Sequence, residues 1–205
     1  MDAGVALMGV TLIAYALASA GALGFLFVRE WGLPGTWLAR AAWAVHTLTL
    51  VVRVAETGRP PFIYLFEAAL FFSWLVMLNY LLLDHFIRLR AVGSFVVPVT
   101  FLILMGAFSL PRESGALVPM LQGFWVFTHV LVAFLGYGAF AVSFVVAVMY
   151  LIQERHLRQK AFRLLFYRLP PLSQLDKVGY QLVMFGFPLL TLAILTGAVW
   201  ARPAW

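Results

Sequence analysis

Two histidines, one arginine and one glutamate lie within or at the ends of long apolar stretches of this 205-residue sequence: His46, Arg53, Glu67 and His129. An ionisable side chain inside an apolar span is costly to bury, so each is a candidate functional residue. His129 is the strongest candidate, because a neutral imidazole can ligate haem iron. Trp125 lies four residues earlier on the same helix face, where its ring could stack on a flat ligand. The alternative is an interfacial histidine beside a tryptophan of the membrane-interface belt.

His46 and Arg53 lie seven residues apart and therefore share one face of a helix. One interpretation makes His46 a second haem ligand or a proton relay, with Arg53 available to a haem propionate. The other makes His46 a histidine that is hydrogen-bonded to a neighbouring helix. Arg53 and Glu67 flank a turn, and we expect them to form a structural ion pair that closes a helical hairpin.

The composition indicates a membrane protein. Apolar residues make up 64% of the sequence, charged residues only 11%, and the mean hydropathy is +0.98, whereas a soluble domain carries about 25% charged residues. The absence of cysteine excludes disulfides and thiolate metal sites. The net charge of +6 does not indicate nucleic-acid binding, because the basic residues lie in loops beside apolar spans. The sequence contains no hydrolase triad, phosphate loop or zinc motif, which excludes the ordinary classes of soluble enzyme.

The apolar stretches predict an all-α fold, a polytopic membrane helix bundle of about six transmembrane helices that forms one domain over 1–205. The predicted spans are 5–28, 37–54, 64–83, 92–110, 124–152 and 180–200. The last span carries the small residues Gly186, Ala193 and Gly197 on one face, which favours close packing against another helix.

Basic residues gather in alternate loops. Those after the first, third and fifth predicted spans are Arg29, Arg40, Arg88, Arg90, Arg155, Arg158, Lys160, Arg163, Arg168 and Lys177. Those on the opposite side are Arg53, Arg59, Arg112 and Arg202. Because cytoplasmic loops are enriched in lysine and arginine, this distribution predicts that both termini lie on the external face of the membrane.

The loop after the fifth span is long and strongly basic. It predicts a short cytoplasmic helix over 154–168 that lies on anionic lipid headgroups, with Phe162, Leu165 and Phe166 as its apolar strip. The alternative is a helix that docks a partner protein.

Four sequence blocks follow one another in a characteristic order. They are HTLTLVVR at 46–53, GRPPFIYLFEAALFFSW at 58–74, FWVFTHVLVAFLGYGAF at 124–140 and LPPLSQLDKVGYQLVMFGFPLLTLAILTGAVWA at 169–201. This order resembles the cytochrome c assembly protein family, which includes CcsA, ResC and HemX-like proteins. One difference is that Phe66 precedes Glu67 where the family usually has tyrosine.

The resemblance implies a function in haem handling. His129 corresponds to an external axial ligand of haem, so haem b is the expected cofactor. The family places such a protein in the inner (cytoplasmic) membrane as a multi-pass subunit of cytochrome c biogenesis. It would present haem at the external face to apocytochrome c, together with a ResB-type membrane partner. The chain would then be at most one part of a haem-attachment (synthetase) complex.

The family pattern continues past the last block into a tryptophan-rich external loop and further helices with two more histidine ligands, whereas this sequence stops at Trp205. On the resemblance, we expect an N-terminal portion that completes a bis-histidine site only if His46 or another subunit contributes. Two alternatives stay open. One is a HemX-like membrane protein that affects haem synthesis, and the other is a non-catalytic structural subunit of a membrane complex.

Overall fold

The computed structural model describes residues 3–28, 30, 32–111, 123–160 and 164–201, and within these residues it contains helices and no strand. The helices are α1 (Ala3–Phe27), α2 (Gly32–Thr57), α3 (Leu65–Ile87), α4 (Arg90–Phe108), α5 (Phe124–Arg158), α6 (Leu164–Arg168) and α7 (Leu172–Ala201). All of them except the short α6 are long and apolar enough to cross a membrane. The predicted all-α bundle of about six transmembrane helices is therefore confirmed.

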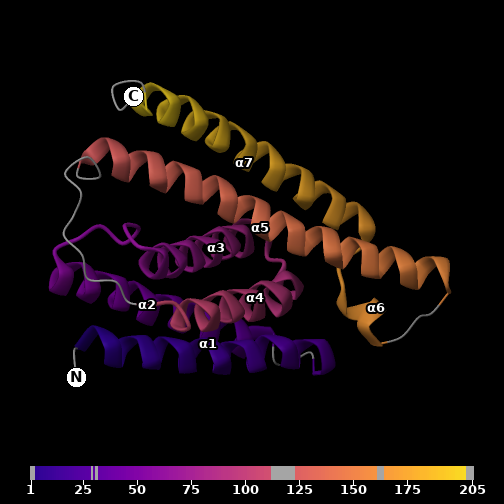
Figure 1. Cartoon of the computed structure of the whole chain (residues 1–205). Coiled ribbons are helices and arrows are strands. Elements are labelled where there is room, and N and C mark those ends of the chain that lie inside the picture. The colour runs from indigo at the N-terminus through magenta and orange to yellow at the C-terminus, as the bar shows by residue number, and fades with distance from the viewer. Residues whose placement is uncertain (1–2, 29, 31, 112–122, 161–163, 202–205) are drawn as a thin grey trace.

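The helices pack side by side, with α7 at the edge of the bundle (Figure 1). α1 packs against α2 and α4, α3 packs against α4 and α5, and α7 lies along α5. Within the described part of the chain, α7 makes no contact of similar extent with any other helix. α1, α3 and α5 begin, and α2, α4 and α7 end, at one end of the bundle. We call this end the His129 end.

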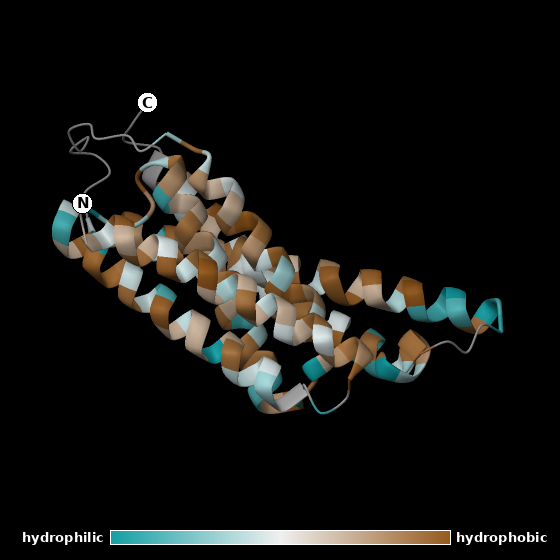
Figure 2. Ribbon diagram, turned by 90° about the horizontal axis from the view of Figure 1, so that it is seen from below, coloured by the Kyte–Doolittle hydropathy of each residue, from teal (hydrophilic) through white to brown (hydrophobic). Residues whose placement is uncertain are grey.

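The distribution of hydropathy along the helices is the one expected of a membrane bundle. In Figure 2 brown and pale residues predominate along the bundle, and the hydrophilic colour gathers most clearly at the end of α5. α5 has 35 residues, so at 1.5 Å per residue it is about 50 Å long and exceeds a hydrocarbon core of about 30 Å. Its polar last turns therefore extend beyond the apolar layer.

The seam between α5 and α7 depends on small residues. A Cβ added to Gly136 would stand 2.9 Å from Cγ of Leu190 and 3.2 Å from the carbonyl oxygen of Gly186. A Cβ added to Gly186 would stand 3.2 Å from the carbonyl oxygen of Gly136. The two backbones approach closely because neither glycine has a side chain, as is common between membrane helices. The predicted packing face of the last span is thus confirmed.

The segment expected to form one interfacial helix over 154–168 is divided in the structure. Its first part is the last turn of α5, which ends at Arg158, and Lys160 then adopts a left-handed φ of 50°. Its last part is α6, which packs against α1 through a hydrogen bond from Nη2 of Arg168 to the carbonyl oxygen of Phe27, 3.2 Å long. Phe162, expected in the apolar strip, lies outside the described residues, as do Arg29, Arg112, Arg163 and Arg202.

Candidate functional site

His129 lies on the face of α5 that packs against α7. Its Nδ1 is 3.1 Å from Oγ1 of Thr196. A Cβ added to Gly197 would stand 2.8 Å from Cε1 of His129. Glycine at position 197 therefore leaves the room that the imidazole ring occupies, and Thr196 fixes the direction of the ring.

The hydrogen bonds around Thr196 determine which nitrogen of His129 carries the proton. Oγ1 of Thr196 donates to the carbonyl oxygen of Leu192 at 2.7 Å, with a longer contact to the carbonyl oxygen of Ala193 at 3.1 Å. Since the hydroxyl proton is directed at the backbone, the hydroxyl oxygen is left to accept from Nδ1–H of His129. Nε2 then carries a lone pair, and it has no hydrogen-bond partner among the described residues. This is the tautomer in which Nε2 can ligate a metal.

Trp125 lies one turn before His129 on α5, and about half of its surface (48%) is exposed. The spacing of four residues sets it on the same helix face. No ring contact joins it to His129 in the described part of the chain. The side chain therefore stands beside the histidine with its indole accessible.

His46 occupies a different interface, between α2 and α1. It is fully buried, its Nδ1 is 3.4 Å from the hydroxyl oxygen of Tyr15, and the two rings meet edge-on with centroids 5.7 Å apart. One turn away, the hydroxyl oxygens of Thr11 and Thr49 are 2.7 Å apart. The structure does not bring His46 to His129, because one ring packs against α1 and the other against α7. Its surroundings are those of a histidine bonded to a neighbouring helix.

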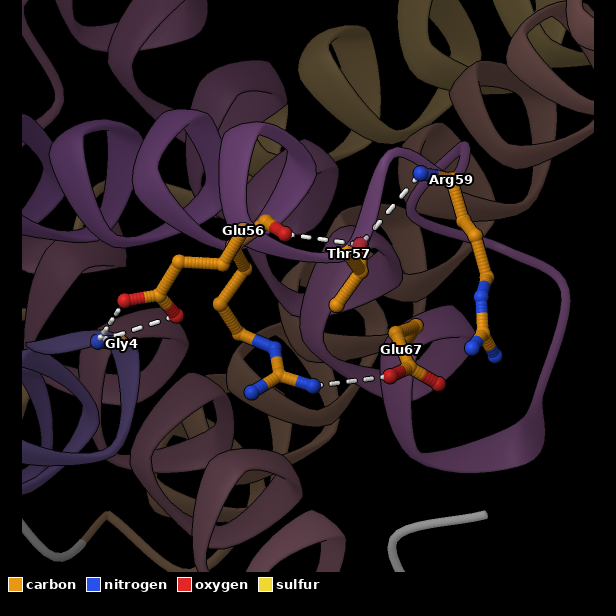
Figure 3. A network of polar contacts seen from close by, with 6 residues as sticks. Gly4, Glu56, Thr57, Arg59 and Glu67 are labelled. Carbon is orange, nitrogen blue, oxygen red and sulfur yellow. Dashed lines mark hydrogen bonds and ion pairs between the residues drawn. The ribbon is translucent and has the colours of Figure 1, made fainter. Parts of the chain in front are cut away.

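Arg53 and Glu67 form the ion pair expected at the α2–α3 hairpin. Nη2 of Arg53 is 2.9 Å from Oε1 of Glu67, and the side chains are only 13% and 15% exposed. The guanidinium also lies 5.2 Å from the ring centroid of Phe66. Figure 3 shows the surrounding network, in which the Glu56 carboxylate accepts from the backbone nitrogen of Gly4 at 3.0 Å. The pair thus ties α2 to α3, while Glu56 ties α2 to α1.

A groove that the sequence did not predict opens between α2, the α2–α3 turn, α3 and the start of α5. Its volume is about 690 Å³, and its walls are mostly apolar and aromatic. The lining residues are Thr47, Leu50, Val51, Val54, Gly58, Arg59, Pro60, Pro61, Phe71, Trp74, Gly123, Phe124 and Phe127. The sequence contains the Gly-Arg-Pro-Pro turn and the Phe-Phe-Ser-Trp stretch that supply part of this lining. Only the packing of α2, α3 and α5 brings them together into a groove.

Trp74 forms the centre of an aromatic stack behind this groove. Its ring lies 5.2 Å from that of Trp43 and 6.0 Å from that of Phe71, with interplanar angles of 21° and 13°. Its Nε1 donates to Oγ1 of Thr47 at 2.8 Å, and that hydroxyl donates to the carbonyl oxygen of Trp43. These bonds hold the indole in a fixed orientation.

Residues 62–205 match the family model described as "Cytochrome C assembly protein". The cytochrome c biogenesis protein CcsA of Guillardia theta is 33% identical over 178 residues, which cover 78% of this chain and 59% of that protein. The protein HemX of Brevibacillus brevis is 32% identical over 161 residues, with the same two coverages. The protein HemX of Bacillus subtilis is 31% identical over 199 residues, which cover 93% of this chain and 71% of that protein. The chain thus spans about three fifths of the length of the first two relatives, and it belongs to the cytochrome c assembly protein family.

Proposed function

We propose that this protein is a haem-handling membrane subunit of cytochrome c biogenesis that holds haem b through Nε2 of His129. The observation that carries the proposal is the hydrogen-bonded unit of His129, Thr196 and the Leu192 carbonyl, which leaves a lone pair on Nε2. Membership of the cytochrome c assembly protein family makes haem the fitting ligand for this nitrogen.

The donor set fits one axial position of haem. His129 supplies the nitrogen, Thr196 orients the ring, and Trp125 offers an exposed indole for stacking on a macrocycle. His46 lies in another interface, so we propose that the second axial ligand lies outside residues 1–205, and a ResB-type partner is one candidate for it. Bound haem supplies the vinyl groups to which the cysteine thiols of apocytochrome c add, while the residues of this chain hold and orient it.

The charge distribution supports an orientation with the His129 end outside. Arg53 and Arg59 are the described basic residues at that end, whereas Arg88, Arg90 and the basic last turn of α5 lie at the other. We therefore propose that both termini and His129 face the exterior of the cytoplasmic membrane, where haem would be presented to apocytochrome c. Within this orientation α6 and the end of α5 form a cytoplasmic interfacial segment.

The test is the absorption spectrum of the protein purified from haem-replete cells. We expect a Soret band that is lost in His129→Ala and kept in His85→Ala, a matched change at an exposed histidine of the opposite end. A Soret band of equal intensity in His129→Ala would overturn the assignment. A colourless wild-type protein would favour a structural subunit.

A HemX-like effect on haem synthesis is the second candidate, because the alignment with HemX of Bacillus subtilis extends over nearly the whole chain. Deletion of the gene separates the two functions. Loss of c-type cytochromes with normal haem synthesis supports the assembly function, whereas a change in the cellular level of haem precursors supports the HemX-like one.

A further inference from the structure

Another groove opens along the seam between α5 and α7, in the half that lies away from the His129 end (Figure 1). We call it the α5–α7 groove. Its volume of about 490 Å³ lies within the range of about 300–1,000 Å³ typical of ligand pockets. The lining residues are Ser143, Val146, Ala147, Tyr150, Leu151, Leu175, Asp176, Gly179, Tyr180 and Val183.

Gly179 is one reason why the seam stays open here. A Cβ added to it would have Cγ1 of Val146 as its nearest neighbour outside α7, at the ordinary contact distance of 3.8 Å. The same addition at Gly136 or Gly186 would bring atoms of the facing helix to 2.9 Å and 3.2 Å. The two helices are therefore in close contact in one half of the seam and leave space for another molecule in the other half.

The α5–α7 groove is apolar toward the middle of the membrane and polar at its outer end. Counted from Phe124, about 20 residues of α5 cross the hydrocarbon core, so Tyr150 lies just beyond it. Tyr180 lines the same part of the groove from α7, and tyrosine is enriched at the interface between membrane and water. Ala147 and Val183 line the part nearer the core. A molecule in this groove thus extends from the hydrocarbon into the headgroup layer.

The outer end of the groove carries an anion and, one turn further out, a cation. Asp176 lines the groove, is exposed, and forms no ion pair with any residue that the structure describes. Lys177 follows it directly and so points to another face of α7. Arg155 lies four residues after the lining residue Leu151, on the same face of α5, and is likewise exposed and unpaired in the described part of the chain.

The two charges lean in opposite directions along the membrane normal. Helical side chains tilt toward the N-terminus of their own helix. α5 and α7 are antiparallel, so Arg155 tilts back over the groove whereas Asp176 tilts outward to the water. A guanidinium favours a phosphate, and a carboxylate favours an ammonium group. In a zwitterionic phospholipid the phosphate lies next to the glycerol and the ammonium lies at the end of the headgroup, which is the same order.

We propose that the α5–α7 groove is a binding site for a zwitterionic phospholipid of the leaflet opposite the His129 end. An acyl chain occupies the apolar part, the phosphate lies at Arg155, and the ammonium group lies at Asp176. The lipid fills the open half of the seam and so holds α7 against α5 where side chains do not. This site is independent of the haem function and of the direction in which the protein is inserted.

The test is a titration of the purified full chain in detergent with dioleoyl phosphatidylethanolamine or dioleoyl phosphatidylglycerol, followed by native mass spectrometry. We expect one saturable site that prefers phosphatidylethanolamine, since the glycerol headgroup has no cation for Asp176. Asp176→Asn should weaken phosphatidylethanolamine binding about fivefold, the upper end for a charge pair at an exposed position, and remove the preference. Arg155→Gln should weaken both lipids, because both carry the phosphate.

A matched pair of valine changes tests the place of the site. Val183→Phe narrows the groove and should abolish saturable binding. Val199→Phe is the control, because Val199 is also an exposed valine of α7 but does not line the groove. Asp176→Asn is a surface change that leaves the helix packing intact, so its result does not depend on how well the phenylalanine variants fold.

Three results would overturn the proposal. The first is wild-type protein that binds phosphatidylethanolamine no more tightly than phosphatidylglycerol. The second is a preference that survives in Asp176→Asn, or binding that is equal in Val183→Phe and Val199→Phe. The third is a dimer that Val183→Phe dissociates while the wild type binds no lipid, which would identify the groove as an interface between two copies of the chain.

Discussion

Replacement of Thr196 by valine is expected to weaken haem binding through the tautomer of His129. Valine has nearly the shape of threonine but offers no acceptor to Nδ1–H. A neutral hydrogen bond such as this one of 3.1 Å contributes about 1 kcal/mol, and a donor left unpaired in a partly buried seam raises the loss to about 1.4 kcal/mol. That free energy corresponds to about a tenfold rise in the dissociation constant. It lies at the lower end of the ~10–100-fold losses that follow removal of a ligand's hydrogen-bond partner.

The measurement is a haem titration of the purified protein, followed at the Soret band. Thr196→Ser keeps the hydroxyl and should bind haem like the wild type. Thr191→Val removes another α7 hydroxyl, which donates to the carbonyl oxygen of Phe187 at 2.9 Å and is exposed. It should leave haem binding unchanged. If Thr196→Val binds as tightly as the wild type, or if Thr191→Val loses as much affinity, the tautomer argument is wrong.

Three further experiments test the fold and its orientation. Glu67→Gln leaves the guanidinium of Arg53 uncompensated at low exposure. We expect the free energy of unfolding in SDS to fall by about 2 kcal/mol, between the ~0–1 kcal/mol of exposed pairs and the ~3–5 kcal/mol of buried ones. Unchanged unfolding would show that the pair contributes nothing. Gly93→Ala would bring a Cβ into the hydroxyl of Tyr80, so it should lower the free energy of unfolding by about 1–3 kcal/mol. Adding Tyr80→Phe should restore part of this stability. An equal loss in the double variant would show that the strain lies elsewhere. Because the sequence contains no cysteine, a single introduced cysteine reports the side of the membrane on which it lies. Thr57→Cys should react with a membrane-impermeant maleimide in intact cells, and His85→Cys should react only after permeabilisation. The reverse pattern would show that the proposed topology is inverted.

Hydropathy predicted the six long helices because lipid-facing spans must be apolar along their whole length. It placed several helix ends within two residues, such as the start of α5 at Phe124, but not all of them. α7 begins at Leu172, well before the predicted start at 180, and the backbone nitrogens of Gln174 and Leu175 donate to the carbonyl oxygen of Pro171. The first turns of α7 carry polar side chains and continue the helix beyond the apolar layer. Hydropathy indicates which residues contact lipid, whereas the start of α7 is set by Pro170 and Pro171, which precede its first residue.

For the candidate site, sequence spacing predicted only the contacts within one helix or across a short turn. The spacing of four residues from Trp125 to His129 places the two on one face of α5. The pairing of Arg53 with Glu67 could be predicted because a short turn joins their helices. Thr196 lies 67 residues beyond His129, and no periodicity links the two. Contacts of that kind depend on which helices become neighbours, and the aromatic groove was missed for the same reason.

The attachment of α7 through α5 has a consequence for the order of synthesis. The nascent chain can insert α1 to α5 and pack them before α7 leaves the ribosome, because α7 is not part of the contacts that join those helices. The imidazole of His129 enters the membrane with α5, but it stays unoriented until residues 196 and 197 arrive beside it. The orientation of this histidine is therefore set by the insertion of a single later helix.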